Sequence, residues 1–410
     1  RHVVVAGLGY VGLTLALVMA EEGFLVTGVD VDAGRLDSLR RGDSYVHETG
    51  ISQLLREQIG KNFEVTDELP EAGDVYIISV GTPVRADEGG RLQPVMEDLV
   101  GVATEIGRRL RPGNLVILRS TVPVGTTRRE VLPVLEEASG LVGGRDFHLA
   151  FAPERTAEGK AIQELRELPQ IIGGLNEDSA EATVALFREL THVIVRVDSL
   201  EAAEMAKLVN NTFRDFVFSY SNYVAQLASH FNLDVVEVLH AANQGYPRHQ
   251  VPLPSPGVGG PCLTKDPYIF ATVAEALDHE DSLFEHGRRI NESMHGHVVD
   301  SVVAQLEAVG KNPQECAALV CGLAFKGDPE TGDIRNSSSV VILEMLRSRV
   351  GSVVAHDAVA TDDEIRELDI DPVEVPAAFA GKDLVLFLNN HRSYRKLDVF
   401  AMTRALSLIH

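Results

Sequence analysis

The sequence predicts an α/β protein in which two doubly wound domains are joined by a long central helix and a helical dimerisation domain. Short apolar runs alternate with helical patterns over residues 1–198, which is typical of a parallel sheet covered by helices. A helical pattern without Pro or Gly then extends from Glu201 to His230 and is longer than most globular helices. A second, smaller alternation begins near Pro313. We therefore expect a Rossmann-like domain at each end of the chain.

The first region, residues 1–198, carries the clearest patterns. Its apolar runs predict strands at His2–Ala6, Leu25–Val29, Val75–Val80, Leu115–Arg119, Phe147–Ala150 and Val193–Val197. Its helical patterns include Leu13–Glu22, Met96–Leu110 and Ser179–Leu190. Because strands and helices alternate, we expect the strands to be parallel.

The central region, residues 199–308, is predicted to be helical around a long loop. The helix Asp234–Ala242 follows the long helix, the Pro- and Gly-rich segment Gln244–Pro267 is too long for a simple connection, and helical patterns resume from Tyr268 to Leu306. Aromatic residues of the long helix lie on several faces, so that it must be buried by more than one neighbour. They include Phe213, Phe216, Phe218, Tyr220 and Tyr223. We expect a central spine that also forms a homodimer interface.

The C-terminal region, residues 309–410, is predicted to be the smaller α/β domain. Its strands are expected at Ala317–Leu323, Ser352–His356 and Asp383–Leu388, and its helix at Ser337–Leu346.

The composition argues against several classes of function. With 37 Lys and Arg against 60 Asp and Glu, the formal net charge is −23, which opposes binding to nucleic acid and to anionic membranes. No run reaches the roughly 20 apolar residues of a membrane span, and glycines interrupt the first apolar stretch, which lacks a signal-peptide pattern. Three cysteines at irregular spacing suit neither a disulfide framework nor a metal site. We expect a cytoplasmic protein without a bound metal.

The glycine-rich turn after the first strand predicts a dinucleotide site. It fits G-x-G-x-x-G between a strand and a helix, a pattern that lets a pyrophosphate approach the helix N-terminus. The expected contacts in the turn are Gly7, Gly9, Tyr10, Val11 and Gly12. Asp30 ends the next strand, where a carboxylate accepts a ribose 2′-hydroxyl and repels a 2′-phosphate. We therefore expect NAD rather than NADP, a preference that Arg35 would weaken.

Three further loops follow predicted strands, where open α/β sheets bind ligands. They are residues 79–83, 120–123 and 152–155. Each loop alone is generic, but their co-occurrence favours function. The cofactor contacts expected in them are Gly81, Thr82, Ser120 and Thr121.

The segment PGVGGPCLTKDP, residues 256–267, is the sharpest feature. A cysteine in a glycine-rich loop, followed four residues later by Asp266, has neither a core setting nor a metal-ligand spacing. The pattern favours Cys262 as a nucleophile that acts as its thiolate, the alternative being a buried inert thiol. Cys316 and Cys321 lie on an apolar strand and its approach, which favours core positions.

Together these motifs resemble those of the nucleotide-sugar 6-dehydrogenases, over nearly the whole chain and in order. They are residues 7–12, 81–83, 120–126, 152–155, 207–211, 256–267, 322–328 and 333–335. The resemblance implies an NAD-dependent, four-electron oxidation of the C6 alcohol of a UDP-hexose to a carboxylate. It also implies a thiohemiacetal and then a thioester on Cys262.

The resemblance further implies residue roles. Lys207 matches a lysine that stabilises oxyanionic intermediates, and Asn211, one helical turn away, should assist it. Thr121, Glu154 and Asp266 match positions that organise a catalytic water and relay protons, in no order that we can rank. Positions that match substrate-binding residues are Glu154, Arg155, Lys207, Asn211, Arg248, Gly259, Lys326 and Arg335. Among these, the resemblance implies that Arg248 reaches the substrate of a neighbouring subunit.

The sugar and two other classes of function remain open at this point. Residues 155–165, 211–215 and 254–260 look more like the N-acetylhexosamine branch, whereas Pro261 departs from it and residues 263–266 look like the glucose branch. UDP-N-acetyl-D-mannosamine is the favoured substrate and UDP-glucose the alternative. A two-electron hydroxyacid-type dehydrogenase would need neither the Cys262 loop nor a third domain. A non-catalytic nucleotide-sugar binder would not need Lys207 and Asp266.

Overall fold

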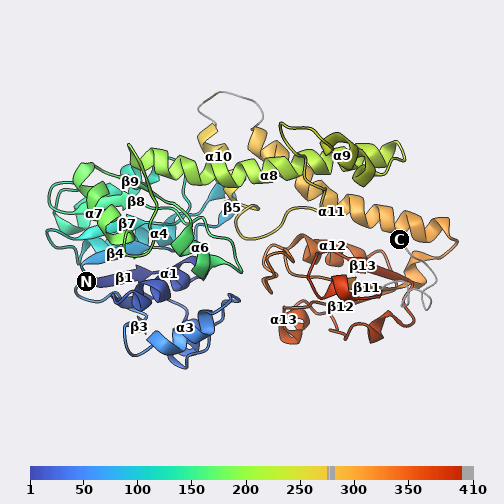
Figure 1. Ribbon diagram of the computed structural model, residues 1–410, viewed down its shortest axis with the longest axis horizontal. Coiled ribbons are helices and arrows are strands. Elements are labelled where there is room, and N and C mark those ends of the chain that lie inside the picture. Colours follow the sequence, from blue (N-terminus) through green and yellow to red (C-terminus); the bar gives the residue numbers. More distant parts are fainter. Residues whose placement is uncertain (275–276, 278–281, 399–410) are drawn as a thin grey trace. The chain divides into compact units, whose positions relative to one another are not determined.

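The structure is a computed structural model that describes residues 1–274, 277 and 282–398 (Figure 1). The chain divides into two compact units. The first comprises the described residues of Arg1–Asn210 and Tyr268–Asp278, and the second those of Asn211–Pro267 and His279–His410. Each unit contains its own sheet and hydrophobic core. Parts of the predicted regions 268–306 and 309–410 lie outside the described residues.

The first unit contains most of the strands. They are β1 (His2–Ala6), β2 (Leu25–Val29), β3 (Phe63–Thr66), β4 (Val75–Ile78), β5 (Val84–Ala86), β6 (Leu92–Pro94), β7 (Leu115–Leu118), β8 (His148–Phe151), β9 (Gln170–Gly174) and β10 (Ile194–Val197). Its helices are α1 (Tyr10–Glu21), α2 (Ala33–Arg40), α3 (Ile51–Gln58), α4 (Glu97–Gly107), α5 (Leu132–Ser139), α6 (Ala161–Glu167) and α7 (Glu177–Phe187), with a short turn η1 (Thr127–Val131). Two helices contribute residues to both units, α8 (Leu200–His230) and α10 (Asp266–Ala274).

The second unit adds the remaining elements. Its helices are α9 (Val235–Asn243), α11 (Leu283–Ala308), α12 (Ser338–Arg347) and α13 (Asp362–Arg366). Its strands are β11 (Ala317–Cys321), β12 (Ser352–His356) and β13 (Leu384–Phe387), and its short turns are η3 (Pro313–Glu315), η4 (Ala377–Phe379) and η5 (Tyr394–Lys396).

An eight-stranded sheet in the order β10-β9-β8-β7-β4-β1-β2-β3 forms the first unit. β1 lies inside this sheet, where it pairs in parallel with β2 and β4. Val3 and Val5 pack into the core that contains α1, whereas Val4 packs into the core that contains α4. A strand buried on both faces is apolar throughout, which is why the sequence predicts β1 correctly.

The expectation that every strand of this sheet is parallel is wrong at one pair. β9 runs antiparallel to β8, and β10 runs parallel to β9. The sequence does not predict β9, because the strand ends in two glycines, a residue type that is rare in strands. A Cβ at Gly173 would lie 2.2 Å from the Ser199 carbonyl oxygen, and one at Gly174 would lie 2.5 Å from the Ala180 amide nitrogen. The neighbouring backbone therefore requires glycine at both positions.

A three-stranded parallel sheet in the order β12-β11-β13 forms the core of the C-terminal region. One face packs against α11 and α12, through side chains that include Leu306 and Leu343, and Phe379 and Tyr394 lie in the core of the other face. The predicted strands and helix of this region end within two residues of the observed bounds. The two predicted Rossmann-like sheets are thus confirmed.

The long helix α8 spans 31 residues and agrees with its prediction. Phe213, Tyr220 and Tyr223 are 66%, 55% and 50% exposed, whereas Asp215 and Asn222 are 1% and 0% exposed. This distribution is the reverse of an ordinary amphipathic helix. An apolar face of this kind marks an interaction surface, and the homodimer stays a prediction.

Candidate active site

The glycine-rich turn joins β1 to α1 at the carboxyl edge of the large sheet (Figure 1). Gly7 has a φ of 92°, and a Cβ there would lie 2.8 Å from the backbone that follows β4. A Cβ at Gly12 would lie 1.8 Å from the Gly7 carbonyl oxygen, whereas one at Gly9 would meet no atom within 4 Å. The turn is therefore open at Gly9, directly before Tyr10 and Val11 at the N-terminus of α1. Amide groups and the dipole at such a helix end favour a phosphate.

Asp30 directly follows β2 and is 7% exposed. Its Oδ2 accepts a hydrogen bond from the Leu8 amide at 2.9 Å and lies 3.5 Å from Arg35 Nη1. The Arg35 guanidinium lies 5.6 Å from the ring centre of Tyr45, whose hydroxyl donates to the Leu8 carbonyl. The open turn, the helix end and this carboxylate fit a dinucleotide whose ribose hydroxyl would donate to Asp30.

The loops after β4 and β7 are hydrogen bonded to one another. The Thr82 hydroxyl donates to the Thr121 carbonyl at 2.5 Å, and the Ser120 hydroxyl donates to the Val80 carbonyl at 2.7 Å. A Cβ at Gly81 would meet no atom within 4 Å. Because β4 and β7 pair in parallel, both loops lie at the carboxyl edge where the glycine turn also lies. The structure thus brings the four expected cofactor residues of these loops together.

Glu154 lies in the loop after β8 and is buried beside Arg119, which directly follows β7. The two side chains form an ion pair and are 8% and 1% exposed. The other oxygen of Glu154 accepts the amides of Arg155 and Thr156 at 2.6 Å and 2.7 Å. Burial acts to raise the pKa of Glu154, but the Arg119 charge and the Thr156 amide outweigh it, so that the pKa lies below its ordinary value. Glu154 is therefore an anion at neutral pH.

Lys207 on α8 is 9% exposed, and its ammonium group donates to the Glu154 carbonyl oxygen. The structure therefore brings these two predicted catalytic residues of the first unit together. The Arg155 side chain lies close by, with one nitrogen donating to the Pro169 carbonyl and another 3.5 Å from Asn210 Oδ1.

The predicted catalytic residues of the second unit gather at the start of α10. Cys262 is an exposed residue, and its carbonyl oxygen accepts the Asp266 amide at 2.9 Å, one turn further along. The Asp266 side chain is fully buried. One of its oxygens accepts a hydrogen bond from Asn211 Nδ2 at 2.6 Å, and the other lies 2.8 Å from Lys265 Nζ. The carboxylate is thus held by an amide and an ammonium group.

The glycines before Cys262 are closely packed. A Cβ at Gly257 would lie 2.5 Å from His295 Nε2, and one at Gly259 would lie 2.6 Å from the Asn336 carbonyl oxygen. The Gly260 amide donates to the same oxygen at 2.9 Å. Packing against α11 and the start of α12 therefore accounts for these glycines, and substrate binding by Gly259 stays a prediction.

Two buried arginines next to these residues are missed by sequence reasoning. Arg119 pairs with Glu154, and Arg288 pairs with Asp215 at 2.7 Å, and each arginine side chain is 1% exposed. The burial of Arg119 could have been inferred from its position at the end of an apolar strand. The second lies in the polar sequence of α11, where an arginine is ordinarily a solvated residue.

Three of the cations expected to bind the substrate lie in the second unit, whereas Arg155 and Lys207 lie in the first. The Lys326 ammonium group lies 5.3 Å from the ring centre of the preceding phenylalanine. Arg335 is paired with Asp333, with Nε 2.9 Å from the carboxylate and 59% of the side chain exposed. The Arg248 guanidinium lies 5.3 Å from the Tyr246 ring centre. A bound diphosphate or carboxylate would compete with Asp333 for Arg335.

The C-terminal sheet repeats the glycine and acidic positions of the large sheet. Gly322 follows β11 with a φ of 92°, as Gly7 follows β1 with the same value. Asp357 follows β12, as Asp30 follows β2. Asp357 accepts the amide of the residue after Gly322 at 2.7 Å. The two sheets therefore share the connection that builds a dinucleotide site.

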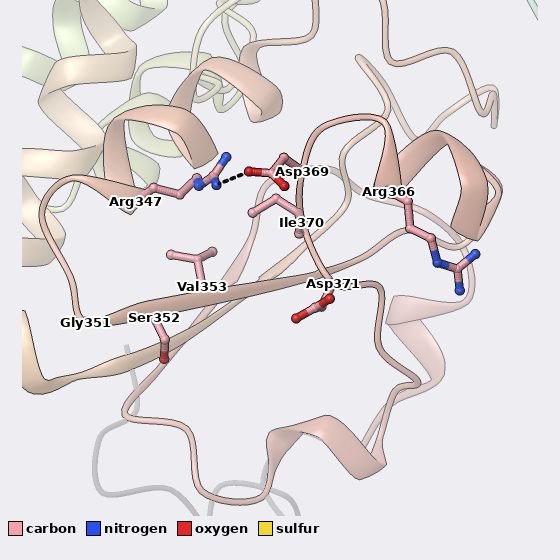
Figure 2. A pocket seen from close by; sticks show the side chains of 8 residues that line it. All are labelled: Arg347, Gly351, Ser352, Val353, Arg366, Asp369, Ile370 and Asp371. Atoms are coloured by element: carbon pink, nitrogen blue, oxygen red, sulfur yellow. Dashed lines mark hydrogen bonds and ion pairs between the residues drawn. The ribbon is translucent and has the colours of Figure 1, made fainter.

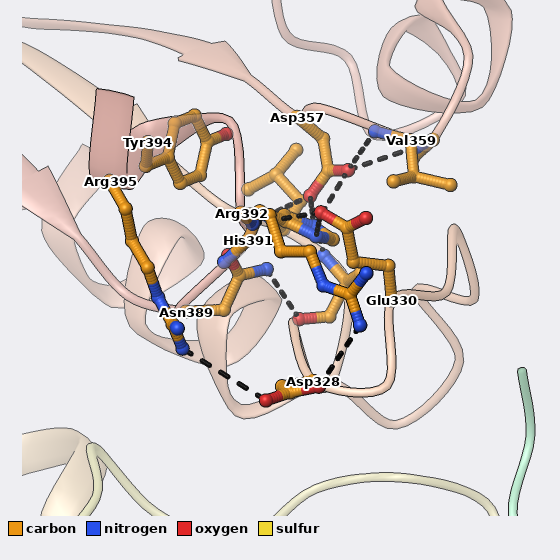
Figure 3. Close-up of polar contacts among 12 residues, drawn as sticks. Asp328, Glu330, Asp357, Val359, Asn389, His391, Arg392, Tyr394 and Arg395 are labelled. Atoms are coloured by element: carbon orange, nitrogen blue, oxygen red, sulfur yellow. Dashed lines mark hydrogen bonds and ion pairs between the residues drawn. The ribbon is translucent and has the colours of Figure 1, made fainter. Parts of the chain in front are cut away.

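Polar side chains of the protein itself gather around Asp357, among them Asn389 and His391 (Figure 3). Asp357 and His391 are fully buried, with Nε2 of the histidine 3.2 Å from the carboxylate. Burial acts to raise the pKa of Asp357, but the hydrogen bonds from His391 and from backbone amides lower it to about 2. A Cβ at Gly322 would lie 2.4 Å from Asn389 Oδ1. Asp357 is thus paired with a fully buried histidine, whereas Asp30 lies beside a partly exposed arginine.

A hollow of about 450 Å³ opens at the opposite edge of this sheet, near the first residues of β12 (Figure 2). Its lining residues are Arg347, Gly351, Ser352, Val353, Arg366, Asp369, Ile370 and Asp371. Arg347 pairs with Asp369 at 3.1 Å. Open α/β sheets bind ligands beyond the carboxyl ends of their strands, so this hollow lies at the wrong edge for the candidate site.

Among residues 1–274, 277 and 282–398, no helix is long and apolar enough to cross a membrane. Over the same residues, no group of three or more His, Cys, Asp or Glu side chains could hold a metal ion. Cys316 and Cys321 are buried, as predicted, and burial raises the pKa of Cys321 to about 12.

Three family models match the chain in succession. Residues 1–191 match the NAD binding domain of the UDP-glucose/GDP-mannose dehydrogenase family, residues 201–293 its central domain and residues 319–407 its UDP binding domain.

Individual relatives match along nearly the whole length. A UDP-N-acetyl-D-mannosamine dehydrogenase of Pyrococcus horikoshii is 33% identical to this chain, over 97% of this chain and 91% of its own length. The solved structure of such an enzyme from P. horikoshii has a TM-score of 0.89 at 30% identity, over 99% of this chain and 93% of that chain. A UDP-N-acetyl-mannosamine dehydrogenase structure from Staphylococcus aureus has a TM-score of 0.84 at 31% identity, over 99% and 92%. A UDP-glucose dehydrogenase structure from Pyrobaculum islandicum has a TM-score of 0.86 at 27% identity, over 99% and 96%. The chain therefore belongs to the UDP-glucose/GDP-mannose dehydrogenase family and is an NAD-dependent UDP-sugar dehydrogenase.

Proposed function

We propose that this enzyme oxidises the C6 alcohol of UDP-N-acetyl-D-mannosamine to the carboxylate, with Cys262 as a covalent nucleophile. The observation that carries the mechanism is the exposed residue Cys262 at the start of α10, one turn before a buried Asp266 that is bonded to Asn211 and Lys265. An exposed cysteine in a closely packed loop, next to a buried carboxylate, suits a reactive thiol better than a core position.

The proposed chemistry has two oxidations and one hydrolysis. Bound NAD supplies the hydride acceptor for each oxidation. The alcohol first becomes an aldehyde, the Cys262 thiolate adds to its carbonyl carbon, and loss of a second hydride turns the thiohemiacetal into a thioester. Water then attacks the thioester and releases the thiolate. One alcohol, one water and two NAD thus give one carboxylate, two NADH and three protons.

Each predicted catalytic residue has a proposed role that its surroundings support. Lys207 stabilises the developing oxyanion as a preorganised cation. Glu154 is held ionised by Arg119, and because its lowered pKa makes it a weak base, its surroundings favour water positioning over proton transfer. Asp266, oriented by Asn211 and Lys265, is the better candidate for the proton relay. Thr121 is proposed to position the water.

The substrate assignment rests on the relatives. The P. horikoshii and S. aureus proteins, at 30–33% identity, are both described as acting on UDP-N-acetylmannosamine. UDP-glucose is the alternative, because the P. islandicum structure has a similar TM-score. Lys326 and Arg335 are proposed to bind the diphosphate and the sugar carboxylate. We place the reaction in the reducing cytoplasm, because it needs Cys262 as a thiol.

The exposed face of α8 is proposed to pair with a second copy of this chain. Phe213, Tyr220 and Tyr223 on α8 and Phe231 just after it are all at least half exposed. Aromatic residues of this size are enriched at protein interfaces. A homodimer would bury this face, and it would also allow Arg248 to reach the substrate of the other subunit.

The first experiment measures the NADH formed per mole of limiting UDP-N-acetyl-D-mannosamine, with UDP-glucose in parallel, for the wild type and Cys262→Ser. We expect two NADH per sugar for the wild type. The variant should lose net turnover or accumulate an aldehyde-level or acyl species. One NADH per sugar together with an unaffected variant would contradict the covalent mechanism. The substrate with the higher kcat/KM identifies the sugar.

A further inference from the structure

The second half of α8 turns polar side chains toward the interior of the second unit. Asp215, Ser219 and Asn222 are at most 1% exposed, whereas Phe213 and Tyr220 on the same helix are more than half exposed. Burying polar groups is unfavourable unless they are hydrogen bonded. The sequence could have placed apolar residues at these positions, so the polar set calls for an explanation beyond helix packing.

A connected buried network joins α8 to α11. Arg288 Nη1 lies 2.7 Å from Asp215 Oδ1, and Asn291 Nδ2 donates to the same oxygen at 2.8 Å. Asn222 Nδ2 donates to Asn291 Oδ1 at 2.8 Å. Burial raises the pKa of Asp215 despite the neighbouring Arg288 charge. Buried ion pairs of this kind contribute little net stability compared with apolar residues of similar volume.

Arg288 Nε also pairs with Glu292 at 3.1 Å. Three further hydrogen bonds of the network reach the backbone of the Cys262 loop, on both sides of the cysteine. Arg288 Nη2 donates to the Val258 carbonyl at 2.8 Å, and Nη1 donates to the Leu263 carbonyl at 3.3 Å. Asn222 Oδ1 accepts the Ser255 amide at 2.8 Å. One planar guanidinium thus holds two carbonyl groups five residues apart, a geometry that a lysine cannot reproduce.

The opposite side of the loop is also fixed, because the Gly260 amide donates to the Asn336 carbonyl and Gly257 and Gly259 have no room for a Cβ. The loop is therefore held from two directions, by backbone packing near α12 and by the buried network. Of these supports, only the network can be removed by side-chain substitution without adding atoms.

We propose that Arg288, held by Asp215, which Asn291 orients, is the positioning residue that fixes the Cys262 loop for the covalent step. The inference rests on the proposed role of Cys262 and adds a residue that acts through the backbone of the loop. Misplacement of a reacting group by about 1 Å can cost on the order of 100-fold in rate. The loss should fall mainly on kcat, because the network holds the loop backbone on both sides of Cys262, and its contact with Val258, next to the predicted substrate residue Gly259, should change KM less.

The test compares Arg288→Lys with Arg349→Lys, which makes the same exchange at the exposed Arg349–Asp300 pair. For Arg288→Lys we expect kcat to fall about 10- to 100-fold with KM for the UDP-sugar within about threefold. Amide hydrogen exchange of the peptide covering residues 255–265 should accelerate at least about tenfold, whereas other peptides keep their rates. Arg349→Lys should match the wild type in both measurements.

A second pair of variants separates loop positioning from general stability. The double variant Arg288→Met/Asp215→Leu removes both buried charges, so its unfolding temperature should fall less than that of Asp215→Leu alone, which leaves the Arg288 charge unpaired. It should nevertheless show the same fall in kcat and the same acceleration of exchange at residues 255–265 as Arg288→Lys. Leu306→Ala, in the core at the other end of α11, should lower the unfolding temperature while retaining kcat below it. If Arg288→Lys does not fold, the double variant carries the test.

Two outcomes overturn the inference. One is a folded Arg288 variant with wild-type kcat. The other is an increase in exchange spread evenly over the second unit, which would mark a general structural role. Cys262→Ser assayed in parallel keeps the proposed function separate. If that variant still yields two NADH per sugar, the covalent mechanism fails whatever the Arg288 variants do.

Discussion

Replacing Glu154 with glutamine tests the buried ion pair in the first unit. The side chains of Arg119 and Glu154 are 1% and 8% exposed, so the variant leaves a buried guanidinium without its counter-charge. Removing one partner of such a pair costs about 3–5 kcal/mol. Glutamine keeps the size of the side chain and can still accept the amides of Arg155 and Thr156, so the loss reflects charge rather than packing.

The assay is urea unfolding followed by circular dichroism, because the chain contains no tryptophan. With m-values of about 1–3 kcal/mol per molar urea, we expect the midpoint of the first unit to fall by at least about 1 M. The double variant Arg119→Met/Glu154→Leu removes both charges and should recover part of the loss, the rest remaining because the Arg155 and Thr156 amides and the Ala152 carbonyl lose their partners. Equal midpoints for the wild type and Glu154→Gln, or a double variant no more stable than the single one, would refute this reasoning.

The same pair makes stability depend on pH. The pKa of Glu154 in the folded chain is below its ordinary value, since the Arg119 charge outweighs burial. Its contribution is therefore complete above the unfolded pKa of about 4.3 and is lost as the pH falls through the lower folded pKa. The difference in unfolding free energy between the wild type and Glu154→Gln should stay constant from pH 7 to 5 and shrink below about pH 4.

Four further outcomes are expected. Asp30→Asn removes the charge that repels a 2′-phosphate, so the kcat/KM ratio for NAD over NADP should fall at least about tenfold; an unchanged ratio would remove Asp30 from the cofactor site. Asp266→Asn should lower kcat at least about 100-fold while the circular dichroism spectrum is retained, and full activity would exclude it from the proton relay. Phe213→Glu places a charge on the exposed face of α8, and sedimentation velocity should then report a monomer; an unchanged mass would contradict the proposed dimer interface. Within α4, Gly107→Ala puts a Cβ 2.6 Å from a neighbouring side chain, whereas Gly101→Ala meets nothing within 4 Å. The first should therefore lower the unfolding free energy by about 1–3 kcal/mol and the second raise it by about 0.5–1 kcal/mol, and equal effects in thermal unfolding would refute the packing argument.

Elements with uniform burial could be predicted from the sequence. β1 is apolar because both of its faces are covered, and the turn at Gly7 and Gly12 is glycine because backbone lies within 3 Å of each missing Cβ. Burial and close backbone contact each restrict the residue type at single positions, so that they leave a local pattern in the sequence. The loop around Cys262 is recognisable for the same reason, since its glycines are required by contacts with α11 and the start of α12.

Features that depend on distant partners could not be predicted in this way. Arg288 is separated from Asp215 by 73 residues, and Arg119 from Glu154 by 35. From the sequence alone, a charged residue is expected to be exposed to solvent unless its buried partner is known. Tyr45 likewise donates a hydrogen bond to Leu8 of the glycine turn, which lies 37 positions earlier in the chain. The antiparallel strand β9 could not be predicted because its two glycines are required by contacts with neighbouring backbone, and glycine is a residue type that is rare in strands.

The glycine turn of the C-terminal sheet bears on the order of events in the reaction. The residue of that turn that corresponds to Gly9 is Ala324, which is fully buried and whose carbonyl accepts Asn389 Nδ2 at 3.2 Å. A Cβ at Gly9 would meet no atom within 4 Å, so within the described residues the turn at Gly9 is the open one of the pair. If a single cofactor position serves both oxidations, the half-oxidised sugar must be retained while spent cofactor is exchanged for fresh. A covalent bond to Cys262 would provide that retention. If the fold is repeated but the cofactor site is not, two NAD molecules must therefore bind one after the other while the same sugar stays bound.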